Sequence, residues 1–449
     1  MYDLIILGAG PAGYLAAERA GAAGLNTVLI EKENLGGVCL NEGCIPSKTI
    51  LHSAKLYRQA GHSQAYGVTA SNVMFDLASV MARKEKIIDT LRKGIAATLK
   101  KHHVTVETGE GTILSWQDKV FRVQVNSRIV EGTRLLVCTG SKAIRLPIPG
   151  ADQKFVHTNR EILSIDFIPE RLVVVGGGVI GLEIATFFAE VGSSVTVIEL
   201  LTSIGGPIDS EIAQILQKEL EKKGVTFRLQ AKVTAIGDSS VSFEANGQNE
   251  SIKADIVLMS VGRKPVTKGI GLENLNVYVE NGAIKTDEQG RTNVPGVWAA
   301  GDVNGISMLA HTAYREAEVC INDMLHKKDR MRYSAVPAVI YTHPEVATVG
   351  LTVDDAEKRG YKVVSAKLPL SYSGRYCVEN EGGRGVCKVV IDKQYKTLLG
   401  VHMIGGMCSE MIFGAAAMID NELRVDDIKE IIFPHPTVSE IIKDTLWQI

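Results

Sequence analysis

The chain contains two copies of one nucleotide-binding pattern, and this repeat limits its possible folds more than any other feature. In the first copy, an expected apolar strand, residues 2–7, runs into the spacing Gly-x-Gly-x-x-Gly and an alanine-rich helix ending at about Ala23. A second apolar strand, residues 27–30, then ends in the acid Glu31. The three glycines are Gly8, Gly10 and Gly13. The order of strand, glycine turn, helix, strand and acid predicts one Rossmann-like fold.

The second copy repeats this order 168 residues later. An apolar strand begins at Leu172, a helix is expected over residues 182–191, and a strand over 194–198 ends in Glu199. Glu31 lies 23 residues after Gly8, and Glu199 lies 23 residues after Gly176. The glycines of this copy are Gly176, Gly178 and Gly181. The glycines could serve packing alone, but a whole unit repeated in register favours nucleotide binding.

Each part of the pattern has a physical reason. The first glycine permits a tight turn, the second lets backbone approach a pyrophosphate, and the third lets the helix pack on the strand. The helix N-terminus offers free N–H groups to phosphate, and the terminal glutamate accepts hydrogen bonds from a ribose diol. The repeat therefore predicts binding of two dinucleotides, which suggests FAD and a nicotinamide.

Two cysteines, Cys39 and Cys44, follow the first copy with four residues between them. Such a pair can close a small, easily reduced disulfide loop. The next segment, residues 45–57, is expected to be helical despite Pro46. If both cysteines lie in its first turns, the helix dipole stabilises a thiolate. A zinc half-site and two buried thiols without chemistry are the alternatives.

Bulk composition excludes several classes of function. The chain has 449 residues, is 45% hydrophobic and carries a net charge of -2, so we expect two to four domains and no nucleic-acid partner. No apolar run reaches the length of a membrane span, and no metal-ligand cluster is evident. The first residues already form an expected strand, and the seven cysteines are scattered, which favours the cytoplasm.

The segment Gly36–Lys48, GGVCLNEGCIPSK, closely resembles the redox-active stretch of the flavin disulfide reductases, in the form that dihydrolipoamide dehydrogenases use. The resemblance covers the chain from Tyr2 to its last helix. It implies FAD in the first fold, beside the cysteines, and a pyridine nucleotide in the second. Glu199 would repel a 2′-phosphate, and Leu200 and Leu201 supply no arginine for one, so NAD is favoured over NADP.

The same resemblance implies further flavin contacts. Asp302, after Gly301, would bind a ribitol hydroxyl, although Gly-Asp alone fits an ordinary turn. A helix beginning near Ala310 and ending at about Met324 would direct its positive end at the flavin. Apolar strands 135–139 and 256–261 would leave the two folds at Gly140 and Gly262. Next to the latter, Arg263 would contact NAD phosphate or ribose, or be a solvated turn charge.

Lys48 and Glu183 form another pair that the resemblance implies. Lys48 is expected one turn beyond Cys44 on the redox helix, and Glu183 at the start of the second nucleotide helix. In the family these residues pair beside flavin N5. Hydride would pass to NAD over the flavin face beside Ile180.

The last third of the chain, after about residue 330, alternates strands and helices without phosphate loops. It is expected to be an oligomerisation domain. Near its end, His435 and Glu440 resemble the His-Pro-Thr-x-x-Glu of the family, in which histidine is the acid/base for the thiols of the other subunit. Thr437-x-x-Glu440 also forms a capping box for the last helix. Strands are expected over 335–341, 386–391 and 397–404, and helices over 353–359, 409–421 and 425–431.

The expected fold class is α/β, with two Rossmann-like dinucleotide-binding domains and a carboxyl-terminal α+β dimerisation domain. Residues 1–148 would bind FAD and carry the redox disulfide, and 149–264 would bind NAD. Residues 265–330 would complete the FAD site, and 331–449 would form the interface of a homodimer. The segments 373–384 and 405–410 resemble the family poorly, and Cys377, Cys387 and Cys408 have no expected role.

The expected reaction is oxidation of protein-bound dihydrolipoamide with reduction of NAD⁺. Partners would be a lipoyl domain or lipoyl carrier protein of a 2-oxo acid dehydrogenase, acetoin or glycine-cleavage complex. One alternative is reduction of another low-molecular-weight disulfide by NAD(P)H. Another is a binding or scaffold subunit that keeps the flavin fold without turnover, against which the intact Cys39, Cys44, Lys48 and His435 argue.

Overall fold

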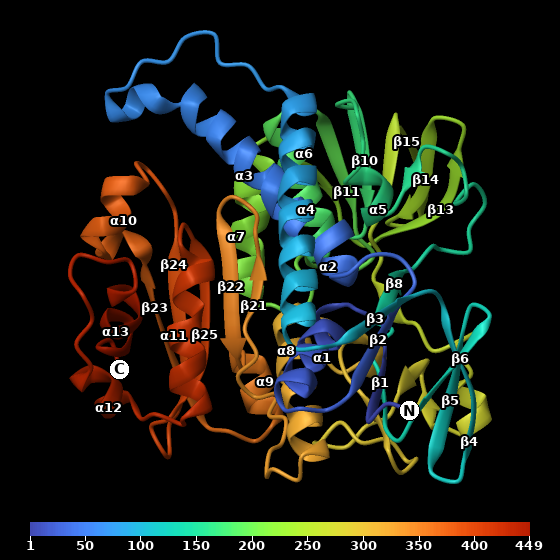
Figure 1. Ribbon diagram of the computed structural model, residues 1–449. Helices are drawn as coiled ribbons and strands as arrows, with labels where there is room; N and C mark the ends of the chain where they lie inside the picture. The colour runs from blue at the N-terminus through green and yellow to red at the C-terminus, as the bar shows by residue number, and fades with distance from the viewer. The chain divides into compact units, whose positions relative to one another are not determined.

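A computed structural model describes residues 1–449 as two compact units, each assembled from separate stretches of the chain (Figure 1). We describe each unit by itself. The first unit comprises Met1–Thr49, Ala78–Ile144 and Gly262–Arg332, and the second comprises Ile50–Leu77, Arg145–Val261 and Tyr333–Ile449. The four domain limits expected from the sequence stay predictions.

The first unit contains a five-stranded parallel sheet in the order β20-β7-β1-β2-β3. Side chains of β1 alternate between its two faces, as the two-residue period of a strand requires. Leu4 and Ile6 pack with the alanines of α1 and α8, whereas Ile5 and Leu7 pack with Phe121 on the other face. The elements are β1 (Leu4–Leu7), α1 (Pro11–Ala22), β2 (Thr27–Glu31), β3 (Thr105–Thr108), β7 (Leu135–Val137), β20 (Val297–Ala299) and α8 (Ala310–Met324).

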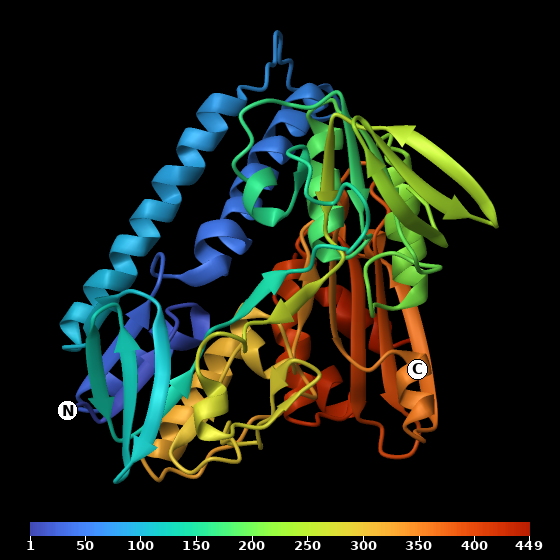
Figure 2. The same cartoon turned by 90° about the vertical axis from the view of Figure 1, so that its right-hand side faces the viewer.

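A three-stranded antiparallel sheet covers the face of Ile5 and Leu7. It appears in cyan at the lower left of Figure 2. The sheet consists of β4 (Gly111–Gln117), β5 (Val120–Val125) and β6 (Arg128–Gly132). The unit also contains α2 (Gly37–Glu42), most of α4 (Leu77–Lys101), and two small ribbons, β8 (Ser141–Ala143) with β17 (Arg263–Pro265) and β18 (Val279–Glu280) with β19 (Ala283–Ile284).

The second unit repeats this plan in its nucleotide fold. A parallel sheet in the order β12-β11-β10-β16-β9 packs on one face against an antiparallel sheet, where Val173 and Val175 contact the cluster around Phe243. The elements are β9 (Val156–His157), α5 (Asn159–Ile162), β10 (Arg171–Val175), α6 (Val179–Glu190), β11 (Ser194–Ile198), α7 (Ser210–Glu221), β12 (Thr226–Arg228), β13 (Ala231–Gly237), β14 (Ser240–Ala245), β15 (Gln248–Lys253) and β16 (Ile256–Met259).

The remainder of the second unit is a five-stranded antiparallel sheet in the order β21-β22-β25-β24-β23, with helices packed on its core. The expected strands and helices of this region are present, but the sequence analysis missed β22, β23 and α10. The elements are β21 (Ala338–Ile340), β22 (Glu345–Gly350), α9 (Val353–Lys358), β23 (Val363–Pro369), α10 (Gly374–Glu379), β24 (Val386–Asp392), β25 (Leu398–Gly405), α11 (Cys408–Asp420), α12 (Val425–Glu430) and α13 (Glu440–Leu446). Helix α3 (Cys44–Gly61) begins in the first unit and ends in the second.

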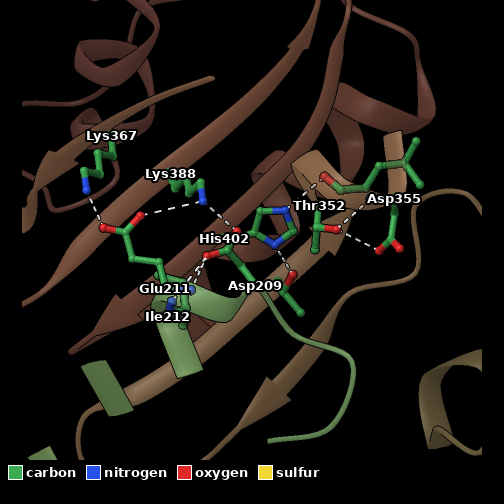
Figure 3. A network of polar contacts seen from close by, with 10 residues as sticks. Asp209, Glu211, Ile212, Thr352, Asp355, Lys367, Lys388 and His402 are labelled. Atoms are coloured by element: carbon green, nitrogen blue, oxygen red, sulfur yellow. Dashed lines mark hydrogen bonds and ion pairs between the residues drawn. The ribbon is translucent and has the colours of Figure 1, made fainter. Parts of the chain in front are cut away.

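Within the second unit, buried charges join the N-terminus of α7 to the antiparallel sheet (Figure 3). Asp209 caps α7 by accepting the backbone N–H groups of Glu211 and Ile212, and its other oxygen lies 2.8 Å from Lys388 Nζ on β24. Burial alone would raise the pKa of Asp209, but the Lys388 ammonium, the backbone N–H of Ile212 and the charge of His402 together lower it. The nucleotide fold and the antiparallel sheet are therefore held together by a paired charge as well as by apolar packing.

The helices show no segment that combines the length and apolar character needed to cross a bilayer.

The first strand is shorter than expected, because Tyr2 only bridges Gly132 and regular pairing of β1 begins at Leu4.

Candidate active site

The two cysteines that follow the first phosphate loop form a disulfide, with their Cα atoms 4.7 Å apart. Cys39 lies in α2 and Cys44 is the first residue of α3. The condition that both cysteines lie in the first turns of one helix is therefore met by Cys44 and not by Cys39, because Gly43 ends α2 and separates the helices. The position of Cys44 exposes its sulfur to the positive end of α3, which favours a thiolate there.

An asparagine braces the redox loop, and the sequence analysis missed it. Asn41 Nδ2 donates to the carbonyl oxygens of Leu35 at 3.1 Å and Gly37 at 2.8 Å, and its Oδ1 accepts from Arg92 Nη2 on α4 at 2.7 Å. The side chain thus ties the start of α2 to the long helix α4. Only the position of Asn41 between the two cysteines hinted at this role.

The first phosphate loop is open at the point where a dinucleotide would bind. Helix α1 begins after Gly10 without a side-chain cap, so its first N–H groups are offered to a ligand. A Cβ atom at Gly13 would lie 1.8 Å from the carbonyl oxygen of Gly8, which explains why only glycine fits there. These residues fit the diphosphate of FAD.

The second phosphate loop has the same geometry. Helix α6 begins after Gly178, with φ −78° and ψ −176°, against −70° and −174° at Gly10. A Cβ atom at Gly181 would lie 2.2 Å from the carbonyl oxygen of Gly176, and no atom lies within 4 Å of one at Gly178. The uncapped helix and the open space fit the diphosphate of a second dinucleotide.

The two predicted ribose acids also hold their own loops. Glu31 accepts the backbone N–H of Ala9 at 2.7 Å, and Glu199 accepts that of Gly177 at 2.6 Å. The other carboxylate oxygens accept from the N–H groups of Glu33 and Leu201, each at 2.8 Å. Each carboxylate keeps lone pairs for a ribose diol, so the observed bonds are compatible with the predicted role.

Arg263 is not a solvated turn charge. It lies on β17, where Nε donates to Ser141 Oγ at 2.8 Å and Nη2 donates to the Ser141 carbonyl at 2.9 Å. The Ser141 hydroxyl in turn donates to Asp302, and burial lowers the pKa of Arg263. Contact of Arg263 with NAD stays a prediction. The role of Ser141, directly after Gly140, was missed because a lone serine carries no sequence signal.

A buried glutamate fixes the turn before Asp302. Glu316, on α8, accepts the backbone N–H of Gly301 at 2.6 Å. Helix α8 begins at Ala310 and ends at Met324, as expected, and it has no side-chain cap at its N-terminus. This N-terminus is the positive end of the helix dipole, as the predicted flavin role requires.

The remaining predicted residues lie on the expected helices. Lys48 is in the second turn of α3, and Ile180 and Glu183 are in the first two turns of α6. Glu183 is 3% exposed, and its Oε1 accepts the backbone N–H of Tyr341 at 3.0 Å. The pairing of Lys48 with Glu183 stays a prediction. Gly262, which follows shortly after β16, has a left-handed backbone with a φ of 113°.

His435 and Glu440 form a polar pair near the end of the chain. His435 Nδ1 lies 2.9 Å and 3.2 Å from the two carboxylate oxygens of Glu440, and the histidine side chain is 80% exposed. The predicted capping box is only half formed. Glu440 accepts the backbone N–H of Thr437 at 2.9 Å, but the Thr437 hydroxyl donates to Pro434, because α13 begins at Glu440 itself.

Comparison with known proteins agrees with this geometry. Residues 2–317 match the model of the pyridine nucleotide-disulphide oxidoreductases, and residues 336–446 match the dimerisation domain of that family. The chain is a pyridine nucleotide-disulphide oxidoreductase. As members of the family do, it carries two dinucleotide-binding folds and a dimerisation domain, which supports a homodimer.

Named relatives within this oxidoreductase family cover the chain almost completely. The chain is 38% identical to a mitochondrial dihydrolipoyl dehydrogenase of Pisum sativum, over 98% of this chain and 90% of the relative. It is 38% identical to dihydrolipoyl dehydrogenase 3 of Pseudomonas putida, over 100% and 98%. Among solved structures, LpdA from Mycobacterium tuberculosis is similar with a TM-score of 0.92 and 25% identity, covering 100% of this chain and 99% of that one.

The three free cysteines of the carboxyl-terminal part of this oxidoreductase remain without a role. Cys387 and Cys408 are buried in the core of the antiparallel sheet, where burial raises the pKa of each thiol, that of Cys387 to about 12. Cys377, on α10, is exposed and donates to the carbonyl oxygen of Ser371 at 3.3 Å. The chain has no group of three or more His, Cys, Asp or Glu side chains that could hold a metal ion.

Proposed function

We propose that this oxidoreductase is a dihydrolipoyl dehydrogenase, which oxidises protein-bound dihydrolipoamide and reduces NAD⁺. The single observation that carries the proposal is the Cys39–Cys44 disulfide at the start of α3, next to a phosphate loop. Curated relatives named dihydrolipoyl dehydrogenase, similar over nearly the whole chain, support it. FAD and NAD are the cofactors that this activity needs.

The thiol chemistry follows from the positions of the two cysteines. A dihydrolipoamide thiolate attacks the Cys39 sulfur, forming a mixed disulfide and releasing Cys44 as a thiolate. The second thiolate of the same dihydrolipoamide then attacks the substrate sulfur that is bonded to Cys39. This attack closes the disulfide of lipoamide and releases the Cys39 thiol. The substrate loses two electrons and two protons, and the protein disulfide gains the two electrons.

The protons need a base. His435 is the proposed acid/base, acting on thiols bound at the disulfide of the facing subunit. The Glu440 carboxylate can only accept, so His435 Nδ1 carries a hydrogen and Nε2 is left to exchange protons. Glu440 thereby orients the imidazole.

FAD, when bound, would supply the redox chemistry that links the disulfide to NAD⁺. Gly10, Glu31 and Asp302 are the proposed FAD contacts, and Gly178 and Glu199 the proposed NAD contacts. The overall reaction is dihydrolipoamide plus NAD⁺ giving lipoamide, NADH and a proton. Glu199 disfavours NADP, because its carboxylate would face the 2′-phosphate.

We also propose a partner and a compartment for the enzyme. Its partner is a lipoyl domain or lipoyl carrier protein of a 2-oxo acid dehydrogenase, acetoin or glycine-cleavage complex. The compartment is the cytoplasm.

Anaerobic assays of the purified holoprotein test the proposal. We expect NAD⁺-dependent oxidation of dihydrolipoamide with a higher kcat/KM than NADH-dependent reduction of glutathione disulfide or coenzyme A disulfide. A preference for either of those disulfides would favour the alternative reductase. Flavin that accepts no electrons from dihydrolipoamide or NADH would favour a subunit without turnover.

A further inference from the structure

The loop after β21 is bonded to α6 at two points. At the first point, the backbone N–H of Tyr341 donates to Glu183 Oε1 at 3.0 Å. At the second, His343 Nδ1 lies 2.9 Å from Glu190 Oε2. Glu183 and Glu190 are seven residues apart, or two helical turns, so both carboxylates lie on one face of α6. The loop therefore has two fixed points only two residues apart.

Glu190 is a buried hub rather than a surface acid. Its side chain is 2% exposed and lies 2.8 Å from Lys223 Nζ and 3.3 Å from Arg58 Nε. Lys223 Nζ also donates to the backbone carbonyl of His343, which adds a third bond to the loop. A carboxylate removed from water to this degree stays charged only when it is paired. Here Lys223 and His343 form hydrogen bonds with it, and the Arg58 guanidinium lies close by.

The charges fix the protonation of His343. Burial alone would raise the pKa of Glu190, but the hydrogen bonds and charges around it lower the pKa to about 2, so the carboxylate is ionised and can only accept. His343 Nδ1 must then carry a hydrogen. Burial lowers the pKa of His343, although Glu190 opposes this, and Lys223 and Arg58 already supply two positive charges. The imidazole is thus neutral, with its hydrogen on Nδ1.

We propose that His343 and Glu190 are positioning residues that hold the Tyr341 N–H against the Glu183 carboxylate. The inference rests on the proposed function, together with the predicted place of Glu183 beside the flavin, where hydride is exchanged with the nicotinamide. Glu183 is not free to choose a rotamer while the loop is held, because its Oε1 is committed to a backbone donor. Loss of the imidazole bond leaves the loop held next to Glu190 only through the Lys223 bond to the backbone of residue 343. It therefore loosens that restraint without altering the cysteines, the phosphate loops or Glu183 itself.

Variants at position 343 separate positioning from general packing. Asparagine offers an amide donor close to the place of Nδ1, glutamine offers it farther out, and alanine offers none. We expect His343→Asn to resemble the wild type, and His343→Gln and His343→Ala to share one defect. Glu221→Gln, on the exposed end of α7, is the control for variants made elsewhere in the nucleotide fold.

Two measurements on the holoprotein test the idea. Hydrogen–deuterium exchange of the Tyr341 amide should be at least about tenfold faster in His343→Ala and His343→Gln, since a bond to a charged acceptor is lost. In anaerobic stopped-flow mixing, flavin reduction by NADH should slow about tenfold to a hundredfold, as expected for a mispositioned group. Reduction by dihydrolipoamide should stay within about twofold of the wild type.

Unchanged exchange at Tyr341, or an unchanged NADH rate, would overturn the proposal. So would an equal loss in both half-reactions, or a defect in His343→Asn as large as in His343→Gln. If His343→Ala does not fold, the comparison of asparagine with glutamine decides. A wild-type protein inert toward dihydrolipoamide would contradict the proposed function alone, since the exchange and NADH measurements need no dithiol.

Discussion

Glu440 holds His435 through the imidazole Nδ1, which lies within 3.2 Å of both carboxylate oxygens. The same carboxylate accepts the backbone N–H of Thr437. That N–H is the leading cause of a lowered pKa at Glu440, with a further contribution from His435. The carboxylate therefore stays ionised well below neutral pH, and the imidazole keeps one orientation while its other nitrogen faces outward.

His435→Gln should slow reduction of the protein by dihydrolipoamide by about 10²–10⁴-fold, the usual contribution of general acid/base catalysis. Flavin reduction by NADH should change far less, because that step needs no proton from His435. Stopped-flow measurement of the two half-reactions checks both statements. Glu440→Gln, which keeps an oxygen acceptor, should cost less than His435→Gln, and an equal effect on both half-reactions would argue against this role.

Mixed dimers test whether His435 acts across the interface. A heterodimer of one Cys44→Ser subunit and one His435→Gln subunit contains one site in which both residues are intact. Co-expression with two affinity tags should therefore give heterodimers with about half of the wild-type activity, although each parent homodimer is inactive or nearly so. Verified heterodimers without activity would place His435 in the site of its own subunit.

The choice of nucleotide depends on Glu199. Glu199→Gln with Leu200→Arg should raise the ratio of kcat/KM for NADPH to that for NADH by at least about tenfold, because a like-charge repulsion is replaced by an attraction. Glutamine is preferred to alanine, since its oxygen can still accept the N–H of Gly177. An unchanged ratio, with folding intact, would show that Glu199 does not face the ribose.

The buried pair Asp209–Lys388 should contribute more to the stability of the fold than the exposed pair Lys367–Glu211 does (Figure 3). Lys388→Met leaves Asp209 buried without its ammonium partner and should lower the free energy of unfolding by about 3–5 kcal/mol. Lys367→Met removes an exposed contact to Glu211 and should cost at most about 1 kcal/mol. Urea unfolding of both variants makes the comparison, and equal losses would contradict the account of this interface.

The lowered pKa of Glu190 predicts how the stability of the protein changes in acid. Its pKa is about 2 in the folded protein and about 4.5 as an ordinary glutamate, so its contribution to stability is complete above pH 4.5 and is lost as the pH falls towards 2. In urea titrations across this window, the wild type should lose stability more steeply than Glu190→Gln, by at most about 1.4 kcal/mol per pH unit. Parallel slopes would mean that Glu190 is not paired as described.

The nucleotide folds could be predicted from the sequence because their constraints are local. The turn admits no Cβ at Gly13, so glycine is required there, and the acid follows at a fixed spacing. Both features can be recognised from residues that are close in the sequence. The redox pair was located by the spacing of its two cysteines, and the start of α8 by the resemblance to the flavin disulfide reductases. The sequence could not show that Glu31 and Glu199 also hold the loops, because a glutamate that binds ribose and one that binds backbone look alike.

Contacts between residues that are far apart in the chain could not be predicted from the sequence. Ser141 and Arg92 act on Arg263 and Asn41 from elements that only the fold brings near, across 122 and 51 residues. The sequence left open whether Cys39 shares a helix with Cys44, because a glycine between two helices cannot be told from one inside a helix. The capping box was half right, since the position where α13 begins depends on how the preceding prolines leave the chain.

The central claim, that Cys39 and Cys44 pass electrons from dihydrolipoamide toward the flavin, is tested most directly by Cys44→Ser. Anaerobic addition of two electrons per FAD to the wild type should produce a long-wavelength charge-transfer absorbance. Reduction of the disulfide would leave a Cys44 thiolate, stabilised at the positive end of α3, as a donor to the adjacent flavin. The variant should bind FAD, show no such absorbance and lose oxidation of dihydrolipoamide. A Cys44→Ser protein that kept near wild-type turnover with dihydrolipoamide would contradict the claim.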